Sequence, residues 1–169
     1  MAYTVKTEGI QEISQMLKSV GEKADAIASS GLYDGAGVMA DEIQKGAEGI
    51  QAGKFHYAVF PEAVQRLPSE EEKAAVVNAD MGIAKFRKGG GEVNTSVGYG
   101  RSGYVLIKGK RKPIPLIANA INSGTSFMKK QPFFRKAVTK ATEPSIAKIK
   151  ETIEGRIDAL TKQNGGTNA

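Results

Sequence analysis

Hydrophobic residues recur at helical spacing in the first part of the chain. Ile10, Ile13, Leu17 and Val20 are three or four positions apart, which predicts an amphipathic helix over residues 8–20 with Gly21 as its stop. A second helical pattern runs over residues 32–50 and contains several glycines. Each glycine costs about 1 kcal/mol relative to alanine, so this helix is expected to pack closely against another element.

The last third of the chain carries a third helical pattern. A stripe of apolar residues predicts a buried helical face against the sheet or against a neighbouring subunit: Ile146, Ile149, Ile153, Ile157 and Leu160. Pro144 precedes the stripe, and a proline inside a helix costs about 3 kcal/mol. A break or bend is therefore expected at Glu143.

The middle of the chain has strand-like patterns. Residues 51–68 are expected to be irregular, and Ser69 with Glu72 forms a capping-box pattern that starts a short helix. Runs at 83–87, 93–97 and 104–107 have strand character, and the glycines between the first two predict a hairpin. Residues 116–121 fit either a buried strand or a turn of helix.

These patterns predict an α+β fold, in which an N-terminal helical region and a long C-terminal helix pack on a small antiparallel sheet. The length of 169 residues fits one domain, assigned to residues 1–163. Residues 164–169 hold little that could be buried and are expected to form a flexible tail.

Composition narrows the possible functions. The chain has no cysteine and one histidine, His56, which disfavours disulfides, thiolate metal sites and histidine-rich metal sites. No apolar run approaches the roughly 20 residues of a membrane span, and the first residues lack a signal-peptide pattern. A soluble protein made in the cytoplasm, without a membrane partner, is expected.

Positive charge is concentrated in one stretch. The formal net charge is +6, yet residues 93–142 contain no acidic residue and ten basic ones. A basic side suits nucleic acid, and a basic side with an acidic remainder suits contact between copies of the chain. A solvated basic loop without a partner is the plain alternative. Four of these residues surround a turn and are the candidates for contact with DNA or a docking partner: Lys108, Lys110, Arg111 and Lys112.

Several motifs that resemble catalytic or nucleotide sites have simpler explanations. Gly98-Tyr99-Gly100 with Gly103 is followed by a strand-like run and not by the helix that a dinucleotide site needs. Acidic residues at 70–72 suit the first turn of a helix. His56 has no nucleophile motif to serve and is interpreted as a loop residue. The sequence therefore predicts no enzyme and no cofactor.

One segment is specific enough to suggest a family. Residues 116–138 run through an apolar segment, Ser123-Gly124-Thr125, a short basic linker and Gln131-Pro132-Phe133-Phe134. This order resembles the signature of the tail-completion (minor tail or neck) proteins of long-tailed bacteriophages. The family motif residues are thus Gly124, Thr125, Pro132, Phe133 and Phe134. Glycine permits the turn, a hydroxyl of Thr125 or Ser126 caps or braces it, Pro132 lies in the first turn of the helix, and the two phenylalanines anchor that helix on the sheet.

The resemblance extends over residues 5–162, including the opening helix and the paired strands. Family members commonly have a Thr-Gly-x-Leu segment before the first strand, whereas this chain has the longer stretch 53–80, whose role stays open. The resemblance implies a virion structural protein, assembled in the host cytoplasm as a hexameric ring around the DNA channel. It implies no catalysis. Its implied neighbours are tail-terminator, tail-tube or head-closure proteins, with non-specific contact to genomic DNA.

A different class of function is also compatible with the charge pattern. The chain could be a free DNA-binding accessory protein that uses residues 101–112 as a basic arm. A free DNA-binding protein should shift oligonucleotides at physiological salt, whereas a ring subunit should be found in purified virions.

Overall fold

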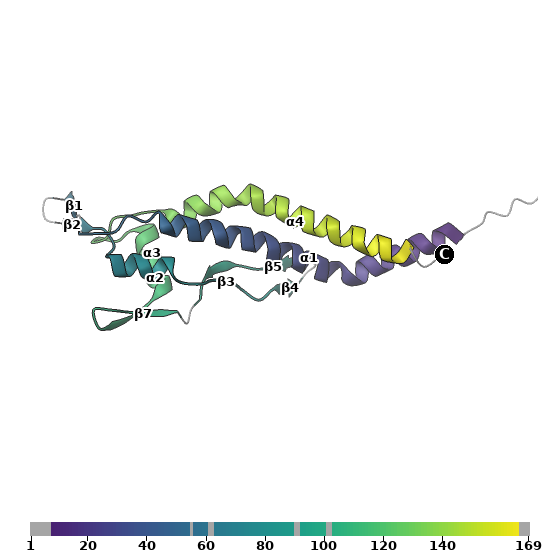
Figure 1. Ribbon diagram of the computed structural model, residues 1–169, viewed down its shortest axis with the longest axis horizontal. Helices are drawn as coiled ribbons and strands as arrows, with labels where there is room; N and C mark the ends of the chain where they lie inside the picture. Colours follow the sequence, from purple (N-terminus) through teal and green to yellow (C-terminus); the bar gives the residue numbers. More distant parts are fainter. Residues whose placement is uncertain (1–7, 55, 61–62, 90–91, 101–102, 166–169) are drawn as a thin grey trace, which may run out of the picture.

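Two long helices lie side by side along the length of the molecule (Figure 1). The computed structural model describes residues 8–54, 56–60, 63–89, 92–100 and 103–165. Helix α1 (Glu8–Glu48) and helix α4 (Phe133–Gly165) run in opposite directions. The other elements gather beside α1, mostly towards the end where α1 finishes and α4 begins. The α+β class expected from the sequence is confirmed.

Glycines in α1 let the two helices approach closely. A β-carbon at Gly35 would lie 2.5 Å from Ile149 Cγ1, and one at Gly31 would lie 2.9 Å from Ile153 Cγ1. A β-carbon at Gly46 would lie 3.2 Å from the Phe133 carbonyl oxygen. The prediction that the glycine-rich segment 32–50 packs against another element is confirmed at Gly35 and Gly46, and the neighbouring element is α4.

Gly21 is not a helix stop, and of the break or bend expected at Glu143 the break is absent. Helix α1 continues as one helix to Glu48. The chain also stays helical through Pro144. Ala141 and Ser145, on either side of this proline, are buried, whereas Pro144 itself is exposed. Packing of the flanking residues against α1 holds the helix together where local preference alone would end it.

Within the described residues the strands form four separate antiparallel pairs and not one small sheet. β1 (His56–Phe60) pairs with β2 (Ala63–Arg66), so residues 51–68 are not irregular throughout, as the sequence had suggested. β3 (Met81–Ile83) pairs with β6 (Val97–Tyr99), and β4 (Arg87–Gly89) pairs with β5 (Glu92–Asn94). The hairpin predicted across the glycines is therefore confirmed. β7 (Tyr104–Ile107) pairs with β8 (Lys110–Pro113).

Two short helices complete the compact end. α2 (Glu70–Val77) has the predicted capping box: the Ser69 hydroxyl accepts from the Glu72 N–H, and the Glu72 carboxylate accepts from the Ser69 N–H. Residues 116–121 belong to α3 (Ile114–Ser123), which resolves the earlier choice between strand and helix. α4 reaches Gly165, two residues into the expected tail, and residues 166–169 lie outside the described part.

The main hydrophobic core lies at this compact end. It brings together side chains from α1, α2, β7, α3, the segment before α4 and α4 itself. Its most deeply buried members are Ile43, Ala47, Val76 and Ile121. Farther along the helical hairpin, Ile149, Ile153, Ile157 and Leu160 are only half-buried. The compact end therefore contributes most of the buried apolar surface, while the outer half is held chiefly by contact between α1 and α4.

The close approach of α1 and α4 predicts different effects on stability for substitutions at two glycines of α1. Gly35→Val places a branched side chain where Ile149 already lies, so it should lower the melting temperature by several degrees through forced separation of α1 and α4. Gly37→Ala is the control, because a β-carbon there meets nothing within 4 Å. Alanine should be neutral or stabilising by up to about 1 kcal/mol. Equal destabilisation in the two variants, measured by thermal unfolding, would contradict this packing.

Candidate interaction surfaces

The family motif forms a tight joint between α3 and α4. Gly124 ends α3, with a φ of +76° and an N–H that donates to the Ala120 carbonyl at 2.9 Å. A β-carbon at this position would also lie 2.9 Å from Lys130 Cβ. Glycine is required here both for the backbone conformation and for the space.

Thr125 braces the turn that follows, as the sequence predicts. Its hydroxyl oxygen accepts from the Met128 N–H at 3.0 Å, and its own N–H donates to the Met128 carbonyl at 3.0 Å. The turn also joins the β1–β2 hairpin, because the Arg66 N–H donates to the Phe127 carbonyl and the Lys129 N–H donates to the Arg66 carbonyl, both at 2.9 Å. The joint therefore fixes three parts of the chain at once.

Two side-chain amides complete the joint, and the sequence analysis predicted neither. The Asn122 side-chain oxygen accepts from the Phe134 N–H at 3.1 Å and so satisfies a donor at the start of α4. The Gln131 amide accepts from the Gln51 N–H and donates to the Gln51 carbonyl, both at 2.8 Å. Because Gln51 is far away in sequence, no local pattern could have indicated this contact.

Pro132 and the two phenylalanines set the beginning of α4. Pro132 immediately precedes α4, which begins at Phe133. It therefore lies one position before the first turn in which the sequence placed it. Phe133 is buried in the core, and Phe134 is half-buried with its ring edge-on to that of Phe133. Phe133 anchors α4 on α1 and α3 and not on the sheet that the sequence suggested.

The β7–β8 hairpin carries the four basic candidates, and its pleat divides them. Lys108 and Gly109 form a two-residue turn with φ values of +50° and +74°. In the strands, Val105 is paired with Lys112, and Leu106 with Arg111. Since paired residues point to the same face, Lys112 faces the body and Arg111 faces away. The four cations therefore do not act as one patch.

Each face of the hairpin has its own contacts. On the outer face, the Arg111 guanidinium carbon lies 4.2 Å from the centre of the Tyr104 ring, a cation–π contact. Leu106 on the same face is 72% exposed and Tyr104 is 47% exposed. On the inner face, Lys112 Nζ lies 3.4 Å from Glu72 Oε1. Lys108 and Lys110 are exposed and remain available as docking candidates.

Glu72 is a buried carboxylate that links three elements. Arg66 on β2 donates to both of its oxygens, at 2.6 and 2.8 Å, and Lys112 reaches it from β8. Burial raises the pKa of Glu72, but the Arg66 hydrogen bonds, the Ser69 N–H and the two positive charges outweigh burial and lower it to about 2. The sequence indicated the cap but not this ion pair.

The ion pair predicts a pH dependence of stability. Because the pKa of Glu72 is about 2 when folded and 4.5 ordinarily, its contribution is complete above about pH 4.5 and is lost as the pH falls towards 2. Glu72→Gln should cost about 2 kcal/mol at neutral pH and remove that part of the acid sensitivity. Glu71→Gln, at an exposed position, is the control. Denaturant unfolding from neutral to acid pH tests this, and parallel curves for wild type and Glu72→Gln would contradict it.

The C-terminal stripe packs on α1 and not on the sheet. Ile149 and Ile153 lie against Gly35 and Gly31 of α1, and Ile157 and Leu160 are half-buried farther along. Ile146 departs from the prediction, because it is 48% exposed. Its position on α4 turns it away from α1, so the stripe is narrower than the sequence pattern suggested.

Substitutions at a packed and at an exposed position of the stripe should differ in their effect on stability. Ile153→Asp puts a carboxylate against α1 and should destabilise the protein by several kcal/mol. Ile146→Asp should change stability by no more than about 0.5 kcal/mol, because the side chain already meets solvent. Chemical denaturation of both variants checks this. If Ile153→Asp were as stable as wild type, the stripe would not be packed on α1.

The remaining candidates for site chemistry have structural positions in the described part of the chain. His56 begins β1 and is not the loop residue that the sequence suggested. Among residues with described side chains, no group of three or more His, Asp or Glu is placed to hold a metal ion. No helix there is long and apolar enough to cross a membrane.

Comparison with known proteins gives no relative: no family model, no curated protein and no solved structure matches this chain.

Proposed function

We propose that this chain is a virion structural subunit of a long-tailed bacteriophage, which completes the tail tube and joins the tail to the head. The observation that carries the proposal is the joint from Asn122 to Phe134. The residues that resemble the tail-completion signature come together there in one hydrogen-bonded connection between α3 and α4. A signature that fixes a joint, and holds no reactive group, suits a structural subunit.

The outer face of β7–β8 supports an assembled state. Leu106 and Tyr104 are exposed there, on a strand pair that joins no other strand within the described residues. Exposed apolar side chains on a two-stranded pair with open edges favour aggregation of a protein that stays monomeric. Contact with a second copy or a neighbouring ring would cover them. We propose a hexameric ring around the DNA channel, next to tail-terminator, tail-tube or head-closure proteins.

The β7–β8 hairpin supports the competing role, a free DNA-binding protein, less than it supports a subunit of an assembly. A basic arm needs cations that are free to meet phosphates. Lys112 instead contacts the buried Glu72, and Arg111 lies over Tyr104. Of the four candidates only Lys108 and Lys110 extend from the turn without such a contact. They suit either the channel side or a docking contact with an adjacent ring.

A complementation experiment tests the proposed role. Phage lacking this gene should accumulate separate heads and tails, and the wild-type chain supplied in trans should restore joined particles that contain it. Leu106→Asp should fold normally, because the side chain is 72% exposed, yet fail to restore joining. Leu106→Met keeps the apolar surface and should restore it. Joined, infectious particles that lack the chain would refute the proposal.

A further inference from the structure

A basic groove lies between the end of α1 and the beginning of α4, on a part of the surface that the hairpin does not reach. It has a volume of about 500 Å³. Its charged lining comes from α1, from the segment before α4 and from the first turns of α4, and consists of five lysines and one glutamate: Lys45, Lys129, Lys130, Lys136, Lys140 and Glu42. Positive charge thus surrounds the groove from three segments.

The single carboxylate does not cancel this charge. Glu42 pairs with Lys140 at 2.8 Å and with Lys45 at 3.1 Å. Hydrogen bonds from Lys140 and then Lys45 lower the pKa of Glu42, so it is ionised at neutral pH. Glu42 therefore holds the ammonium groups of one lysine on α1 and one on α4, while Lys130 and Lys136 are exposed. The groove keeps a strong positive excess.

The floor of the groove offers little to a bound peptide. Its apolar members Ile50, Phe133 and Ala137 are buried, with exposures of 2%, 7% and 5%. The backbone N–H and carbonyl of Gln51 are already taken by the Gln131 amide. A peptide would therefore find neither an apolar anchor nor, at Gln51, a free strand edge. The groove instead presents the ammonium groups of lysine side chains.

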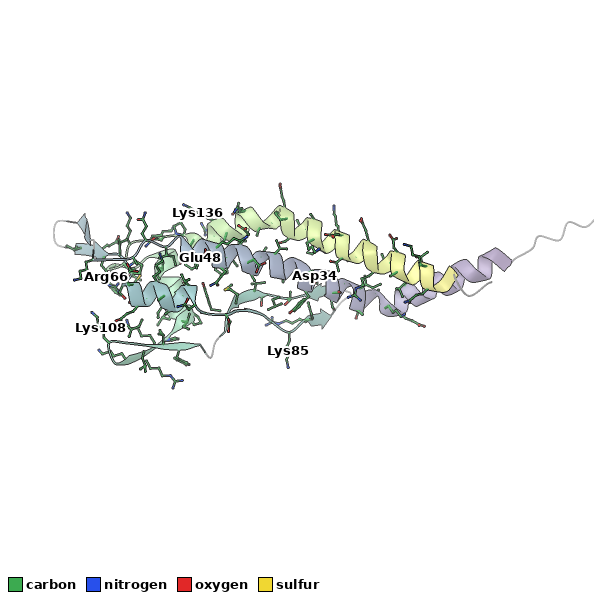
Figure 2. All side chains as sticks on the ribbon, in the orientation of Figure 1. Asp34, Glu48, Arg66, Lys85, Lys108 and Lys136 are labelled. Atoms are coloured by element: carbon green, nitrogen blue, oxygen red, sulfur yellow. The ribbon has the colours of Figure 1, made fainter. Side chains whose placement is uncertain are left out.

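The groove is separate from the hairpin cations. Figure 2 places Lys136 on the upper side of the compact end and Lys108 on the lower side. The acid-free stretch of the sequence is thus divided by the fold between two surfaces. DNA contacts assigned to one of them can be tested independently of the other.

We infer that this groove binds consecutive phosphates along the backbone of duplex DNA. The choice of DNA as the polyanion rests on the proposed function; the fit to phosphates rests on the groove. Lysines hold phosphates as point charges, without the fixed geometry of arginine, and phosphate contacts carry no base sequence. Binding should be weak, salt-dependent and independent of base sequence. These properties suit the lining of a channel through which DNA passes.

The experiment compares matched variants of the full chain. Lys130→Gln with Lys136→Gln removes two groove charges and keeps most of each stem. Lys150→Gln with Lys162→Gln removes two exposed charges from the far half of α4, and Lys108→Gln with Lys110→Gln removes two from the hairpin. Binding to a labelled duplex is measured by fluorescence anisotropy over a range of salt concentrations, and circular dichroism checks that each variant is folded.

The groove variant should bind duplex DNA about tenfold more weakly than wild type, and the slope of log affinity against log salt should fall by about 2. The far-helix variant should keep nearly all of the affinity. The inference would be overturned if the groove variant bound duplex DNA as tightly as wild type, or if wild type bound no duplex at low salt. It would also be overturned if the hairpin variant, and not the groove variant, lost affinity.

Two competitors separate DNA from other anions. Inorganic phosphate at millimolar concentration should not displace the duplex, because one phosphate meets only part of the groove. Poly-glutamate should compete less well than unlabelled duplex at equal charge. If either competed as well as DNA, the groove would be an isolated phosphate site or an acidic-protein site. Either result would leave the proposed virion role standing, because that role is tested by the complementation experiment.

Discussion

The packing of α1 against α4 is the contact on which the other features depend. It is possible because α1 presents glycines where α4 presents Ile149, Ile153 and the backbone at Phe133. With this spacing the two helices remain in contact along most of their length, and Pro144 is held within a continuous helix. The same approach brings the end of α1 beside the beginning of α4, which creates the basic groove and one side of the core.

Polar contacts then fix the compact end. The joint from Asn122 to Phe134 sets where α4 begins, and Glu72 with Arg66 and Lys112 ties β2, α2 and β8 together. Buried ion pairs often add little net stability, but leaving one partner alone is costly. These contacts therefore act mainly by selecting one arrangement of small elements. They also hold the β7–β8 hairpin so that Leu106 and Tyr104 face outward.

Local patterns predicted local features well. The capping box at Ser69, the strand at 104–107, the glycine-linked hairpin and the turn at Gly124 depend on nearby residues, and each is present. The predictions that were wrong involve contacts between residues far apart in sequence. Gly21 and Pro144 looked like helix ends because the opposite helix cannot be read from neighbouring residues. The Gln131–Gln51 and Lys112–Glu72 contacts join residues far apart in sequence, so the groove and the divided basic stretch could not be foreseen.

We propose that the chain is one subunit of a larger assembly, in which the exposed apolar face of β7–β8 and the basic groove contact different neighbours. If the proposal holds, a cryo-electron microscopy reconstruction of the head–tail junction of the phage that would carry this chain tests that claim most directly. The account predicts repeated copies of the α1–α4 hairpin in a closed ring on the tail axis, with Leu106 and Tyr104 covered by a neighbour and Lys136 turned towards DNA. A junction whose rings are all made by other chains, with no density for this fold, would contradict it.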